Sequence, residues 1–73
     1  MKTSDIRVDQ RYTNGKGLVR EVLRIESPLI YSWEEPYVKY IHRTGKKWGE
    51  SDGCYISSFA RWAKSTTPEG GEG

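Results

Sequence analysis

The sequence predicts a small, mainly β domain, an antiparallel and partly open barrel of about five short strands with one short C-terminal helix. Short segments of alternating apolar and polar residues are separated by turn signals rich in glycine and asparagine. The last apolar segment has helical spacing instead. A chain of 73 residues with 34% hydrophobic side chains supports a single core, so we expect one domain.

The first half of the chain contains two predicted strands joined by a tight turn. Gln10–Thr13 is predicted as a short strand, and Asn14-Gly15-Lys16-Gly17 follows as the strongest turn signal. The next predicted strand covers 18–26, where residue types alternate with the period of a half-buried strand. This alternation assigns Val19, Leu23 and Ile25 to one face, and Val22, Arg20 and Arg24 to the other.

The second half is predicted to add further short strands. Ser27-Pro28 ends the preceding strand, because proline donates no ladder hydrogen bond, and a short strand is expected at 29–33. A strand is predicted at 37–43, with a turn at Thr44-Gly45-Lys46. Ser51-Asp52-Gly53 is interpreted as a second hairpin turn before the last strand residues, Cys54-Tyr55-Ile56.

A docked helix is predicted over 57–64. Phe59, Trp62 and Ala63 lie at i, i+3 and i+4, which places them on one face, and Ser57 or Ser58 is the expected N-cap. Residues 65–73 have no apolar side chain and are predicted to be a disordered tail, so the domain spans 1–64. The predicted core consists of Val8, Tyr12, Val19, Leu23, Ile25, Val38, Tyr40, Trp48, Ile56, Phe59 and Trp62.

Scattered positions along the chain carry a resemblance to a known group of proteins. The opening residues that carry it are Ile6-Arg7-Val8, Tyr12, Gly17 and Glu21-Val22-Leu23. The later ones are Val38, Tyr40, Trp48, Phe59 and Trp62. With these residues the sequence resembles small uncharacterised bacterial and phage proteins that have SH3-like barrels. The resemblance implies an SH3-like fold and no particular activity.

The residue types needed for catalysis or metal binding are scarce in this sequence. Cys54 is the only cysteine and His42 the only histidine, so an internal disulfide is excluded and no zinc ligand set is expected. No nucleotide-binding glycine motif occurs, and we expect neither an enzyme nor a cofactor. The sequence has no apolar run of membrane-spanning length and no signal peptide, which makes the cytoplasm the expected compartment.

Two binding functions remain as alternatives. Exposed aromatic side chains are typical of protein interfaces, so the first hypothesis is a protein-binding module, with self-association through an edge strand as one form of it. Its candidate residues are Trp33, Tyr37, Trp48 and Tyr55. The second hypothesis is nucleic-acid binding, since basic residues among aromatic ones suit phosphates and bases. Its candidate residues are Arg20, Arg24, Lys39, Arg43, Lys46 and Lys47.

Overall fold

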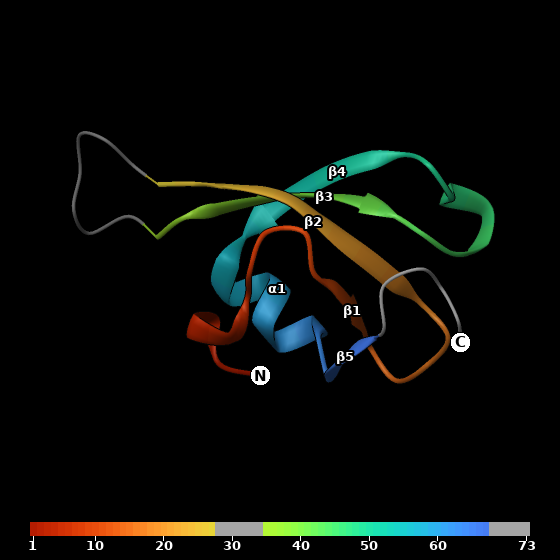
Figure 1. Cartoon of the computed structure of the whole chain (residues 1–73), viewed down its shortest axis with the longest axis horizontal. Helices are drawn as coiled ribbons and strands as arrows, with labels where there is room; N and C mark the ends of the chain where they lie inside the picture. Colours follow the sequence, from red (N-terminus) through yellow and green to blue (C-terminus); the bar gives the residue numbers. More distant parts are fainter. Residues whose placement is uncertain (28–34, 68–73) are drawn as a thin grey trace.

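The predicted fold class is confirmed by the computed structural model, which describes residues 1–27 and 35–67. Five antiparallel strands form one sheet in the order β4-β3-β2-β1-β5, with one short helix near the C-terminus (Figure 1). In chain order the elements are η1 (Thr3–Asp5), β1 (Arg11–Thr13), β2 (Val19–Glu26), β3 (Tyr37–His42), η2 (Gly45–Lys47), β4 (Ser51–Tyr55), α1 (Ile56–Trp62) and β5 (Ser65–Thr67).

The sheet is strongly curved and does not close into a barrel. Strands β2, β3 and β4 form a meander, whereas β1 and β5 lie beyond β2 and turn toward the helix (Figure 1). The outermost strands in the order are β4 and β5, and these two do not pair with each other. In Figure 1, α1 and η1 cover one side of the β2–β3–β4 sheet, and none of the described elements covers the other side.

A β-bulge at Leu23 decides which β2 side chains face the core. Val22 pairs with Tyr40 and Arg24 with Lys39, so Leu23 is the additional residue that has no partner on β3. Both Val22 and, beyond the bulge, Ile25 therefore point inward. Simple alternation across 18–26 predicted Leu23 as a core residue, which is wrong, because the bulge leaves Leu23 exposed.

The core is built around aromatic rings from three elements. Phe59 of α1 is fully buried and packs against Tyr12, Tyr40 and Trp62, with ring centroids 5.4–5.5 Å apart. Aromatic pairs at such distances add to the gain from burial. Besides Phe59, the buried residues are Ile6, Tyr12, Val22, Val38, Tyr40, Ile56, Ala60 and Ala63.

Tyr12 joins the N-terminal segment to this core. Its ring is fully buried, and its hydroxyl donates a hydrogen bond to the carbonyl of Asp5 at 2.8 Å. The same hydroxyl accepts the backbone N–H of Arg7 at 2.7 Å. Burial raises the pKa of Tyr12, so the phenol remains a neutral donor near pH 7.

The helix begins one residue earlier than predicted and is capped by a residue from the segment before β3. Tyr55 occupies the N-cap position without a side-chain cap, so the predicted N-cap at Ser57 or Ser58 is wrong. The backbone N–H of Ser57 instead donates to Oε1 of Glu35 at 2.8 Å. Hydrogen bonds from Ser57 lower the pKa of Glu35, which keeps this carboxylate charged at the positive end of the short helix.

Several predicted boundaries differ from the structure. The chain reverses through η2 and Gly49, so the hairpin predicted at Ser51-Asp52-Gly53 is wrong and these residues lie inside β4. Ser65–Thr67 form β5 along β1, which moves the start of the expected disordered tail beyond residue 67. The strand predicted at 29–33 and the remaining tail lie outside the described residues.

Two other predicted core residues are exposed, and three are partly buried. Val8 lies in a turn before β1, and Trp48 follows η2 with 63% of its surface exposed. Neither belongs to a strand, so the alternation of a strand does not direct either side chain to the core. Ile25 and Trp62 pack against the buried cluster while partly exposed, and Val19 is also partly buried.

Candidate functional site

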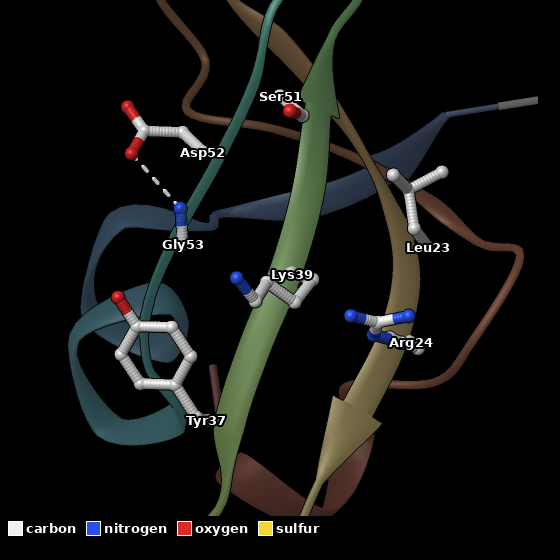
Figure 2. A pocket seen from close by; sticks show the side chains of 7 residues that line it. All are labelled: Leu23, Arg24, Tyr37, Lys39, Ser51, Asp52 and Gly53. Carbon is white, nitrogen blue, oxygen red and sulfur yellow. Dashed lines mark hydrogen bonds between the residues drawn. The ribbon is translucent and has the colours of Figure 1, made fainter.

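The outer face of β2–β3–β4 carries a hollow of about 390 Å³. It lies on the side of the sheet away from α1, because Tyr37 and Lys39 alternate along β3 with the buried Val38 and Tyr40. The lining residues, drawn in Figure 2, are Leu23, Arg24, Tyr37, Lys39, Ser51, Asp52 and Gly53.

The floor of this hollow depends on a glycine in the middle of β4. Gly53 pairs directly with Lys39, and its lack of a side chain lets the Tyr37 ring lie over its backbone. A Cβ built on Gly53 would be only 2.6 Å from Cε2 of Tyr37, which is closer than real contacts allow. Glycine within a strand often marks such a close approach. A glycine within a strand was therefore the sequence signal for this site. The interpretation of 51–53 as a turn hid the signal, because it placed Gly53 outside the strand.

Two basic side chains, Arg24 and Lys39, flank the hollow and differ in their ion pairing. The Arg24 guanidinium is paired with Glu26 through an Nε–Oε2 distance of 2.8 Å, and both groups are largely exposed. Lys39 forms no ion pair within the described ranges. Its amino group lies 5.7 Å from the Tyr37 ring centroid and points toward β4 in Figure 2. The hollow therefore presents an amino group available to an acidic ligand.

Strand β4 is the open edge of the sheet beside this hollow. Its other edge pairs with β3, and the pairing continues just before β4, where the His42 N–H donates to the Glu50 carbonyl at 2.9 Å. Hydrogen-bonded pairs alternate along antiparallel strands, so Ser51, Gly53 and Tyr55 direct their backbone groups to the free edge. No strand of the described part of the chain pairs there.

The side-chain carboxylate of Asp52 already binds one of these outward backbone groups. Oδ1 of Asp52 accepts the Gly53 N–H at 2.9 Å, a bond visible as the dashed line in Figure 2. This bond is the main cause that lowers the pKa of Asp52, and the nearby His42 adds to it. Part of the free edge is thus protected against indiscriminate strand pairing.

The residues predicted for protein binding are only partly brought together. Tyr37 and Tyr55 are neighbours on β3 and β4, packed edge to face with centroids 5.4 Å apart, and Tyr55 is about half exposed. Trp48 lies apart from them at the opposite end of β3, with the Arg43 guanidinium 5.8 Å from its ring centroid. Trp33 lies outside the described residues.

The residues predicted for nucleic-acid binding do not form one continuous patch. Arg24 and Lys39 flank the outer-face hollow, whereas Lys46 and Lys47 lie in η2. Arg43 is engaged by Glu21 at 2.8 Å. Arg20 was assigned to the same face as Arg24, but the bulge between them places the two arginines on opposite faces. Arg20 lies on the inner side, where its guanidinium carbon is 4.1 Å from the Trp62 ring centroid.

Glu21 forms the most extensive ion-pair cluster on the outer face. Its Oε1 accepts from Nε of Arg43 at 2.8 Å and from Nε of Arg11 at 3.2 Å. Burial alone raises the pKa of Glu21, but the hydrogen bonds and charges of the two arginines outweigh burial and lower it. One carboxylate thereby connects β1, β2 and the residue that follows β3.

We expect this cluster to contribute to stability above the ordinary glutamate pKa of about 4.3 and to lose that contribution as the pH falls further. The direction follows from the lowered pKa of Glu21, because the unfolded chain then binds the proton more readily than the folded one. Urea unfolding should show that Glu21→Gln destabilises clearly at neutral pH and much less at about pH 3. Glu50→Gln, at an exposed position, is the control. Equal destabilisation by Glu21→Gln at both pH values would contradict this interpretation.

Other chemistry-bearing residues form no reactive group in the described ranges. Burial raises the pKa of the Cys54 thiol, which packs against the core and remains protonated near neutral pH. Within residues 1–27 and 35–67, no three His, Cys, Asp or Glu side chains are grouped for a metal ion. In the same ranges no helix has the length and apolar character to cross a membrane.

Comparison with protein-family models, with curated proteins and with solved structures found no match for this chain.

Proposed function

We propose that this protein is a small non-catalytic binding module that holds an extended segment of a protein partner at the β4 edge and the adjoining outer-face hollow. The observation that carries the proposal is the hollow above Gly53, where Lys39 and Tyr37 stand beside an open strand edge. The strand order and the helix preceding β5 also support an SH3-like, partly open barrel. The proposed compartment is the cytoplasm, and the proposed origin is bacterial or phage.

Strand addition explains how affinity and specificity would arise at this site. An added strand pairs its backbone with the outward groups of Ser51 and Tyr55 and with the Gly53 carbonyl, because the Gly53 N–H is already bound to Asp52. Neighbouring strands lie about 4.8 Å apart, so a side chain opposite Gly53 lies two such spacings from β3. A glutamate there comes within reach of the extended Lys39 side chain, while Tyr37 and Tyr55 contact the apolar part of the segment.

The test is selection from a random-sequence peptide display library, followed by measurement of dissociation constants. We expect enriched peptides to carry an acidic residue and to bind Lys39→Gln roughly tenfold more weakly than the unmodified protein, since a charge-assisted hydrogen bond is lost. The matched control is Lys2→Gln, an exposed lysine outside the sheet. A library that yields no binder, or peptides insensitive to Lys39→Gln, would contradict the proposal.

Nucleic-acid binding is a second candidate because one exposed aromatic residue adjoins basic side chains. Trp48 directly follows Lys46 and Lys47, and it is the most exposed large hydrophobic residue in the described ranges. Binding of single strands there would fall steeply with ionic strength, with a log–log slope of about −0.7 per phosphate neutralised. Peptide binding at the outer-face hollow depends weakly on salt by comparison, so a salt series distinguishes the two candidates.

A further inference from the structure

A second hollow, of about 280 Å³, lies on the inner side of the sheet beside η2. Its lining shares no residue with the outer-face hollow and consists of Leu18, Arg20, His42, Thr44, Gly45, Lys46 and Lys47. Four of these seven residues carry basic side chains, and none carries a carboxylate. This composition favours an anion.

The central cation of this basic hollow is held rigidly. Arg20 and His42 are direct partners across β2 and β3. The guanidinium carbon of Arg20 lies 4.6 Å from the ring centroid of Tyr40 and 4.1 Å from that of Trp62. Contact with two aromatic rings restricts the guanidinium before any ligand arrives, which reduces the entropy lost on binding.

Two of the residues that line this hollow each carry a buried polar atom without a hydrogen-bond partner. Within the described ranges, the buried side-chain nitrogens that lack a hydrogen bond are Nε of Arg20 and Nε2 of His42. Oδ2 of Asp52 is 3.8 Å from Nε2 of His42, too far for a hydrogen bond. Unpartnered buried polar groups are rare and often indicate a bound ion or water. Both of them belong to residues that line this one hollow.

We propose that the basic hollow binds a compact phosphate group, either free phosphate or a small phosphate monoester. Arg20 supplies a fixed planar donor group, and Lys46 and Lys47 in the exposed η2 turn supply two mobile ammonium groups around the anion. The hollow is slightly smaller than the range of about 300–1,000 Å³ typical of drug-sized ligands, which suits a small anion. This site is independent of peptide binding at the outer-face hollow.

The experiment is a titration of the ¹⁵N-labelled protein with sodium phosphate at constant ionic strength, balanced with sodium chloride. We expect saturable amide shifts confined to Arg20, His42 and residues 44–47. The double variant Lys46→Gln/Lys47→Gln should bind phosphate roughly tenfold more weakly, because two charge-assisted contacts are removed. The control Lys2→Gln/Lys64→Gln removes the same charge from exposed positions outside the hollow and should leave the affinity unchanged.

Further titrations identify the source of the phosphate group. Tighter binding of O-phosphoserine than of phosphate would assign a monoester, and the reverse would assign the free anion. A single-stranded oligonucleotide that binds there and far more tightly than either would overturn the proposal in favour of nucleic acid. Linear shifts without saturation, or equal weakening by both double variants, would show a general charge effect and also overturn it. None of these outcomes affects the proposal of peptide binding at the outer-face hollow.

Discussion

Replacing Phe59 by alanine is expected to lower the free energy of unfolding by about 3–5 kcal/mol, the usual cost of removing a buried aromatic ring. Phe59 is fully buried and packs against Tyr12, Tyr40 and Trp62, so its removal leaves a cavity where the helix meets the sheet. A domain of 73 residues has a total stability of about 4–11 kcal/mol. The variant should therefore unfold at a much lower urea concentration than the unmodified chain, and it is unfolded outright if the total stability lies at the low end of this range.

Urea unfolding followed by tryptophan fluorescence measures this effect. Arg61→Ala is the matched control, because Arg61 lies on the same helix with its side chain exposed. We expect that control to change the free energy of unfolding by less than about 0.5 kcal/mol. A Phe59→Ala protein within about 1 kcal/mol of the unmodified chain would show that the helix is not docked through this ring.

Replacing Gly53 by valine is expected to remove peptide binding with little loss of stability. The added side chain fills the hollow and forces the Tyr37 ring away, since a Cβ would lie 2.6 Å from Cε2 of that ring. The backbone of Gly53 does not need positive φ, and valine suits a strand, so the sheet itself accepts the change. Affinity for a selected peptide should fall by roughly tenfold or more, which corresponds to at least about 1.4 kcal/mol.

The dissociation constant and the urea midpoint are measured on the same samples. Thr66→Val is the control, because it introduces the same residue into β5 at the opposite edge of the sheet. It should preserve binding. If Gly53→Val binds selected peptides as tightly as the unmodified protein, the ligand does not occupy the space above Gly53.

Local patterns predicted the bounds of β2 and β3 well. The strands predicted at 18–26 and 37–43 match β2 and β3 to within one residue at each end, because residues of these strands alternate between the core and the surface. The turn at 14–17 also agrees with the structure, where Gly15 and Gly17 have positive φ and Asn14 Oδ1 accepts the Lys16 N–H. The alternation of residue types and the residues of a turn depend on neighbouring positions alone, so they can be recognised in a single sequence.

Features that depend on pairing between distant segments were missed. The bulge at Leu23 follows from the register of β2 against β3, and it exchanged the expected positions of Leu23, Val22 and Arg20 relative to the core. Strand β5 has only three polar residues and exists because it pairs with β1. The candidate site could be recognised only once β4 was placed beside β3, because Gly53 forms the floor of the hollow only where it lies opposite Lys39.

The central claim is that a partner segment lies along β4 above Gly53, and amide shift mapping tests it most directly. The measurement is a titration of the ¹⁵N-labelled protein with a peptide enriched by display selection. We predict that the largest shifts occur at Lys39, Ser51, Gly53 and Tyr55, with slowed hydrogen exchange of the outward N–H groups of β4. Shifts centred instead on η2 and Trp48, with β4 unaffected, would contradict the claim.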